Sequence, residues 1–151
     1  SCTAGSLAAT FTELPGASIY FRGGIVAYSE AVKISLLDVP SSMLAEHGAV
    51  SQPVAECMAQ AARDKLGADY ALATTGLLGP EGDGSDTPVG TVWLALADHA
   101  GVHSQCLTVN VPRHIGRVRT VYEAVNMLRL RLLEAYPHHR YNPREDTPFA
   151  C

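Results

Sequence analysis

A serine, a tyrosine and a lysine near the start of the chain have the side chains best suited to nucleophilic catalysis: Ser1, Tyr28 and Lys33. Ser1 stands where a helix is expected to begin, and the unpaired N–H groups of a helix start stabilise an alkoxide or an oxyanion. Lys33 is a base only when neutral, which requires a pKa about three units below its usual value of about 10.4, or about 4 kcal/mol. Burial or a nearby positive charge provides such a shift. The Tyr28 phenol, at the end of an expected strand, can hydrogen-bond a substrate or the lysine.

Each of these three residues also has an ordinary structural interpretation. A serine at a helix start is usually an N-cap. A lysine on a short helix usually lies at the surface, and a tyrosine at a strand end usually belongs to the core. Taken one at a time, the structural interpretations are the more frequent ones.

Two further features can bind an anionic ligand. A glycine-rich loop over residues 75–84 follows an apolar strand, where α/β sheets usually bind ligands, and its glycines let backbone amides approach an anion closely. The loop has neither the Walker pattern nor the dinucleotide fingerprint. Arg113 and Arg117 share one face at the start of the last expected helix and can hold a phosphate there. Such arginines are more often solvated or paired with surface acids.

Alternating helix and strand patterns predict an α/β fold in which helices cover both faces of the sheet, as a three-layer sandwich. A hairpin around residues 99–101 makes the predicted sheet mixed rather than purely parallel. The last helix is expected to turn an apolar face inward. That face comprises Val118, Val121, Val125, Leu128 and Leu132. The predicted helices are 1–12, 30–37, a short one ending at 46, 51–67 and 113–135; the predicted strands are 19–28 with a kink at Gly23-Gly24, 70–75, 90–98 and 102–111.

Composition narrows the classes of protein to which the chain can belong. It has 151 residues, 47% of them hydrophobic, a formal net charge of -4 and no basic stripe, so we expect no nucleic-acid partner. No apolar run reaches membrane-spanning length and no leader pattern is present, so we expect no membrane partner. The four cysteines form no C-x-x-C pair and the six histidines no metal-ligand spacing, so we expect reduced thiols, a cytoplasmic location and no metal site.

Taken in order, the segments resemble the CinA C-terminal domain family, the nicotinamide-nucleotide amidases. The resemblance extends to about Leu133. Residues 1–5 are similar to the family's E-S-C-T-G-G with Ala4 in place of a glycine, and residues 15–18 to its P-G-A-S. The remaining similar segments are 21–24 (F-x-R-G-G), 28–33 (Y-S-N-E-A-K), 47–51 (H-G-A-V-S), the loop 76–84, and 88–92 (P-V-G-T-V).

The resemblance implies hydrolysis of nicotinamide mononucleotide to nicotinate mononucleotide and ammonia. Ser1 would be the nucleophile, Lys33 the base and Tyr28 a helper, with no cofactor and no metal. It also implies a homodimer or higher homo-oligomer. A domain over residues 1–136, lacking the strand and helix that precede this serine in the family, would be followed by a polar tail over 137–151. The expected substrate-binding residues are Thr3, Gly5, Thr75, Gly76, Gly79, Pro80, Gly90 and Arg113.

Several departures from the family pattern leave alternatives open. The family's glutamate before the serine and the asparagine of Y-S-N-E-A-K are missing, and its G-D-R is Val111-Pro112-Arg113 here. These changes favour a catalytically silent binding or assembly domain as the alternative to an amidohydrolase. In a third interpretation, the amine of Ser1 itself serves as the base.

Overall fold

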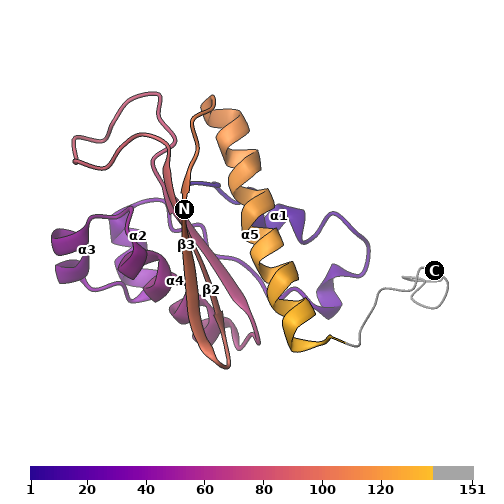
Figure 1. The fold of residues 1–151 in the computed structure, drawn as a ribbon. Helices are drawn as coiled ribbons and strands as arrows, with labels where there is room; N and C mark the ends of the chain where they lie inside the picture. Colours follow the sequence, from indigo (N-terminus) through magenta and orange to yellow (C-terminus); the bar gives the residue numbers. More distant parts are fainter. Residues whose placement is uncertain (138–151) are drawn as a thin grey trace.

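The computed structural model describes residues 1–137, so the predicted tail lies outside the described residues except for Pro137. A three-stranded sheet lies between two groups of helices (Figure 1). The helices are α1 (Ser6–Thr10), the 3-10 helix η1 (Ala17–Ile19), α2 (Glu30–Leu37), α3 (Ser41–His47), α4 (Gln52–Leu66) and α5 (Arg113–Ala135); the strands are β1 (Ala71–Gly76), β2 (Thr91–Asp98) and β3 (Gly101–Thr108).

The sheet has the order β1-β2-β3, and both strand pairs are antiparallel. The predicted hairpin is confirmed, since β2 and β3 pair from Asp98 opposite Gly101 to Thr91 opposite Thr108. Asp98 closes its turn by accepting hydrogen bonds from the N–H groups of Ala100 and Gly101, at 2.7 and 3.2 Å. A hydrogen bond from Arg131 of α5 to the same carboxylate lowers the pKa of Asp98 and joins the turn to the last helix.

Alternate residues of β2 face two different cores, which is the period expected of a strand covered on both sides. Ala95 and Ala97 pack with Val54 and Met58 of α4. Val92 and Leu94 pack in a second cluster that includes Ala124 of α5. The predicted three-layer α/β arrangement is therefore confirmed, with α2, α3 and α4 on one side of the sheet and α1 and α5 on the other (Figure 1).

Three details differ from the predictions. Both described strand pairs are antiparallel, so the parallel pair that a mixed sheet requires does not occur within residues 1–137. The first helix covers only Ser6–Thr10, because Gly5 with φ 91° is its N-cap, and Ser1 is therefore not a cap. Val118 was predicted to face inward but is 69% exposed, while the nearby Gly116 and Thr120 are buried.

The predicted strand over residues 19–28 is also absent. Residues 17–19 form a 3-10 helix and residues 21–28 follow no strand ladder. From Phe21 to Ala27 the residues still alternate between more and less buried, as in a strand. Of these residues only Ala27 is buried. The β-branched and aromatic pattern did not give backbone pairing, which depends on a neighbouring strand.

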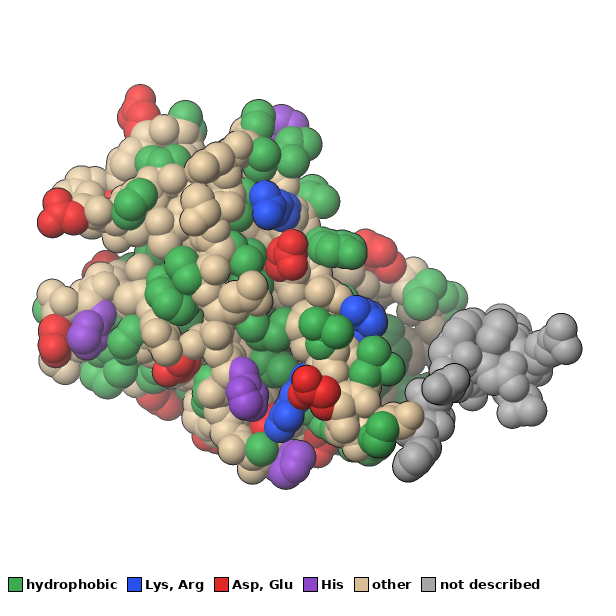
Figure 2. All heavy atoms as spheres, viewed as in Figure 1, with side chains coloured by type: hydrophobic (Ala, Val, Ile, Leu, Met, Phe, Trp, Pro, Cys, Tyr) green, Lys and Arg blue, Asp and Glu red, His purple; other side chains and the backbone are tan. Residues whose placement is uncertain are grey.

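On the face shown in Figure 2, Lys and Arg side chains are separated from one another by acidic and hydrophobic ones. Several large hydrophobic side chains are exposed on α5, including Val118 and Tyr122, both 69% exposed. None of the helices within residues 1–137 has the length and apolar character needed to cross a membrane.

We expect Leu94→Ala to lower the free energy of unfolding by about 2–5 kcal/mol, because Leu94 is fully buried between β2 and α5 and its loss leaves a cavity. Leu14→Ala is the matched control, since Leu14 is 68% exposed, and should change stability by less than about 0.5 kcal/mol. Urea denaturation measures both. Equal effects of the two substitutions would contradict this description of the core.

Candidate active site

The start of the chain is held against the end of β1 by two hydrogen bonds to one carbonyl. The backbone nitrogen of Ser1 donates to Thr74 O at 2.6 Å, and Ser1 Oγ donates to the same oxygen at 3.2 Å. Residues 1–4 form a turn closed by Ala4 N donating to Ser1 O, and Ala4 and Gly5 have φ values of 49° and 91°. This tight turn presents the serine hydroxyl next to the sheet rather than at a helix start.

Lys33 lies on the inner side of α2, and only 3% of the residue is exposed. It shares this side of the helix with Leu37, four residues further on, because residues at that spacing lie above one another on a helix. Ser29 begins the helix, and its hydroxyl accepts a hydrogen bond from Val32 N. Burial lowers the pKa of Lys33 below its ordinary value of 10.5, and the nearby Glu30 only partly opposes this.

Ser1 and Lys33 lie close enough to influence each other electrostatically, but no hydrogen bond joins them in the described residues. The Lys33 charge, together with the larger effect of burial, lowers the pKa of the Ser1 amine to about 6. Lys33 Nζ donates instead to Ala27 O at 3.2 Å, while Ser1 Oγ donates to Thr74 O. The Ser1 hydroxyl and the Lys33 amine therefore each donate to a backbone carbonyl, and direct proton transfer between them requires a side-chain rotation.

Two buried threonines next to Ser1 connect it to the sheet. The hydroxyl oxygens of Thr3 and Thr74 lie 3.4 Å apart, within hydrogen-bond distance, and both residues are almost fully buried. Thr75 Oγ1 donates to Ala49 O at 2.6 Å, so this predicted substrate-binding residue joins β1 to the segment after α3. Thr74 was not among the predicted site residues. The signal for it was a pair of adjacent threonines in an otherwise apolar strand.

A hydrogen bond joins Tyr28 and Arg113. Arg113 Nη2 donates to the Tyr28 hydroxyl at 2.9 Å, and its Nη1 donates to Gly79 O, also at 2.9 Å. Pro80, which follows Gly79, is exposed. The structure thus brings together predicted residues from three segments: the end of the extended segment, the glycine loop and the start of α5.

Gly76 and Gly90 flank the connection between β1 and β2 that contains the glycine loop, and a side chain at either position would be too close to neighbouring atoms. A Cβ on Gly76 would lie 2.8 Å from Val92 Cγ2, on the neighbouring strand. Gly90 has φ 95°, and a Cβ there would lie 2.8 Å from Val109 O. Its N–H donates to Leu77 O at 2.7 Å, so Gly90 closes the base of the loop.

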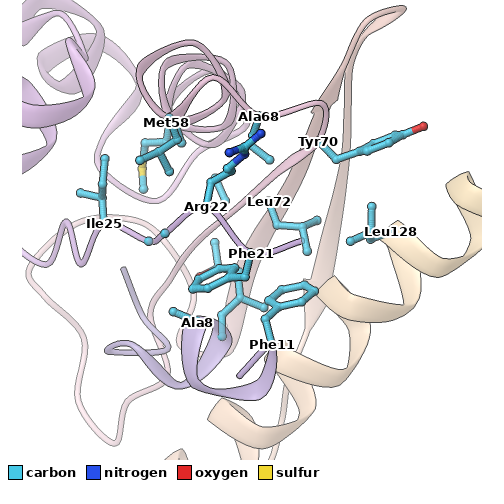
Figure 3. A pocket seen from close by; sticks show the side chains of 18 of the residues that line it. Ala8, Phe11, Phe21, Arg22, Ile25, Met58, Ala68, Tyr70, Leu72 and Leu128 are labelled. Carbon is cyan, nitrogen blue, oxygen red and sulfur yellow. The ribbon is translucent and has the colours of Figure 1, made fainter. Parts of the chain in front are cut away.

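A large apolar cavity of about 640 Å³ lies beside β1 (Figure 3), and Ser1 and Thr74 are among its lining residues. Phe11 and Phe21 stack on one wall, with ring centroids 5.8 Å apart. Thr3 and Gly5 also line the cavity, but Tyr28, Lys33 and the glycine loop do not. Since its lining is mostly apolar, the cavity is poorly suited to a phosphate-bearing ligand, and of Ser1, Tyr28 and Lys33 only Ser1 lines it. Its other lining side chains include Leu72 of β1, Met58 and Leu66 of α4, and Leu128 and Leu132 of α5.

Within residues 1–137, no group of three or more His, Cys, Asp or Glu side chains is arranged to hold a metal ion. Cys2, the neighbour of Ser1, is buried, and burial raises the pKa of its thiol. Its thiol is therefore protonated at neutral pH and poorly nucleophilic.

Residues 1–132 match the family model described as the CinA C-terminal domain. The chain belongs to this family. It is 46% identical over 135 residues to a CinA-like protein of Parasynechococcus marenigrum (strain WH8102), covering 88% of this chain and 32% of that protein. A CinA-like protein of Geobacter sulfurreducens is 47% identical, covering 89% of this chain and 33% of the relative. This CinA domain therefore spans about a third of the length of the curated relatives it matches.

Solved structures of the same superfamily confirm the fold of the CinA domain. The competence damage-inducible protein A (ComA) of Klebsiella pneumoniae subsp. pneumoniae MGH 78578 superposes with a TM-score of 0.83 at 30% identity, over 93% of this chain and 84% of that one. The competence/damage inducible protein CihA of Agrobacterium tumefaciens gives 0.81 at 36% identity, over 85% and 79%.

We expect Gly90→Ala to destabilise this CinA domain by about 1–3 kcal/mol, because the new Cβ meets Val109 O in a strained backbone conformation. Gly82→Ala, in the same loop, is the control: a Cβ there has nothing within 4 Å. Thermal and urea unfolding compare the two variants. If Gly90 acted only on a substrate, both variants would be as stable as the wild type.

We expect Lys33→Met to raise the free energy of unfolding at pH 7, because methionine fills the same space without a buried charge. The lowered pKa means that the unfolded state binds more protons than the folded state, so wild-type stability rises with pH. The advantage of the variant should therefore shrink as the pH approaches 10.5. Urea titrations from pH 7 to pH 10 measure this.

Lys65→Met is the matched control for Lys33→Met. Lys65 lies at the surface, where Lys65 Nζ is 2.7 Å from the Asp38 carboxylate, so its removal should give no gain in stability. A loss of stability in Lys33→Met at pH 7 would show that other interactions more than compensate the buried ammonium.

Proposed function

We propose that this CinA domain hydrolyses the carboxamide of nicotinamide mononucleotide, releasing ammonia and nicotinate mononucleotide. The observation that carries the proposal is the buried Lys33, whose lowered pKa increases the fraction of neutral amine and whose charge acts on the amine of Ser1. A lysine kept from water in this way can serve as a general base, as a surface lysine cannot at neutral pH. Family membership supports the amidase chemistry, whereas the names of the relatives state only that they are CinA-like.

The reaction requires two covalent steps. Neutral Lys33 takes the proton of Ser1 Oγ as the oxygen attacks the amide carbon, and the resulting ammonium then protonates the leaving nitrogen. The carbon–nitrogen bond breaks, ammonia departs, and the acyl group remains on Ser1 as an ester. Water, deprotonated by the neutral lysine, hydrolyses this ester to the carboxylate and restores the serine.

The first step needs Ser1 Oγ to turn away from Thr74 O and towards Lys33 Nζ. Hydrogen bonds between catalytic groups are often long or misaligned until a substrate is bound, so this resting geometry is compatible with catalysis. In the described residues, no hydrogen bond uses the N–H groups of Cys2 or Thr3. These two groups follow the nucleophile directly and are the donors we propose for the oxyanion.

A second candidate function is binding or assembly without catalysis. The observation in its favour is that Ser1 and Lys33 each donate to a backbone carbonyl instead of to each other. In this alternative Lys33 remains cationic during ligand binding, and no ammonia is released.

Ammonia release from nicotinamide mononucleotide distinguishes the two functions. We expect Ser1→Ala and Lys33→Ala each to lower kcat/KM by roughly 10³-fold or more, as for other nucleophile–base pairs. Lys65→Ala should be as active as the wild type, because Lys65 pairs with Asp38 at the surface. Wild-type activity in both Ser1→Ala and Lys33→Ala would exclude the dyad.

The pH dependence and the amine of Ser1 provide further controls. Since only the neutral form of Lys33 accepts a proton, kcat/KM should rise with pH and level off below pH 10.5. A longer chain in which Ser1 follows another residue has an amide in place of the amine. Activity retained in that chain would support Lys33 as the base, and activity lost on extension would support the Ser1 amine.

A further inference from the structure

The guanidinium of Arg113 is engaged by two neutral oxygens of the protein. Its Nη2 donates to the Tyr28 hydroxyl and its Nη1 to Gly79 O, both at 2.9 Å. No acidic side chain within residues 1–137 forms an ion pair with it. A planar guanidinium with two parallel donors fixes the relative positions of both acceptors, which a lysine in the same place does not do.

The direction of the Arg113–Tyr28 hydrogen bond determines what the phenol can do. Arginine has only donors, so the phenolic oxygen must be the acceptor. The O–H of Tyr28 therefore remains available to donate to a third group. Tyr28 can therefore act as a hydrogen-bond donor while Arg113 holds its oxygen.

Tyr28 also adjoins the group that holds the lysine. Lys33 Nζ donates to the carbonyl of Ala27, the residue directly before Tyr28 in the chain. The peptide bond between Ala27 and Tyr28 thus contains the oxygen that accepts from Lys33, and the residue after it carries the phenol. A shift of Tyr28 would consequently move the acceptor of the lysine as well.

We propose that Arg113 is a positioning residue that orients Tyr28 as a hydrogen-bond donor to the reacting amide, and that it does not bind the phosphate of the substrate. The inference rests on the proposed function, and it replaces the substrate-binding role expected for Arg113 from the sequence. No proton is transferred by Arg113 itself. Tyr28 would donate a hydrogen bond to the carboxamide or to the leaving nitrogen, while Lys33 carries out the proton transfers.

A double-mutant cycle tests this role. Arg113→Gln should lower kcat for nicotinamide mononucleotide by roughly 10- to 100-fold, the range for groups that orient a reacting residue, with little change in KM. In the Tyr28→Phe background, Arg113→Gln should have no further effect, because the phenol through which it acts is gone. Arg113→Lys, which keeps the charge but not the two parallel donors, should recover only part of the loss.

Arg119→Gln is the control for this cycle, because Arg119 is exposed on the same helix and has no ion pair within the described residues. It should leave both kinetic constants unchanged. A phosphate ligand would behave differently from a positioning residue. If Arg113→Gln raised KM equally with and without the Tyr28 hydroxyl, and had no effect on a substrate lacking the phosphate, the proposal would be overturned.

A second readout does not depend on activity. In protein with ¹³C-labelled tyrosine, Tyr28→Phe identifies the Cζ resonance of Tyr28, and Arg113→Gln should shift it while Arg119→Gln does not. If the wild type released no ammonia, the proposed function would fail, and the inference about Arg113 would be judged by this resonance. An unchanged resonance in Arg113→Gln would overturn the inference whatever the activity.

Discussion

The ammonium group of Lys33 is buried within a small domain, and a single backbone carbonyl, that of Ala27, accepts its hydrogen bond. Removing such a charge from water disfavours the cation and lowers the stability of the folded state. Packing alone does not require a lysine here. Leucine or methionine would fill the same position on α2. A lysine here makes sense when the neutral amine, rather than the cation, is the useful species. The site described above depends on this one constraint.

Two segments of the fold hold Lys33 and Ser1 in fixed positions. α2 begins at the Ser29 cap, and Lys33 and Leu37 are the residues that it buries. β1 contributes Thr74, whose carbonyl holds both the nitrogen and the hydroxyl of Ser1. Ser1 and Lys33 therefore belong to separate segments, each hydrogen-bonded to backbone atoms that side-chain substitutions leave in place.

The fold was largely predictable from the sequence because its strongest signals are local. The predicted helix over residues 51–67 and the β2–β3 hairpin both depend on residues close together in the chain, and both are confirmed. Pairing of the segment 19–28 could not be predicted, since a ladder requires a partner strand that sequence pattern alone does not identify. Val118 was misplaced because α5 packs through small residues such as Gly116, not only through its large apolar ones.

The candidate site was predictable in its residue types but not in its contacts. Ser1, Tyr28 and Lys33 were recognised from the order of short motifs, whereas the acceptors of Ser1 and Lys33 are backbone carbonyls that carry no signal in the sequence. The pairing of Arg113 with Tyr28 joins residues 85 positions apart, so only the fold reveals it.

Main-chain hydrogen bonds of Gly90 separate the exposed outer part of the glycine loop from the sheet. Gly90 donates to Leu77 O and accepts from Val109 N, so a short set of main-chain bonds closes the loop before its outer part begins. Residues 81–86 beyond this point are exposed, and a Cβ on Gly82 or Gly84 would meet nothing nearby. Changes of length or composition in that outer part are thus isolated from the strands that carry Thr74 and Thr75. We expect related chains to differ there, and a reporter peptide inserted there to leave β1 and its threonines in place.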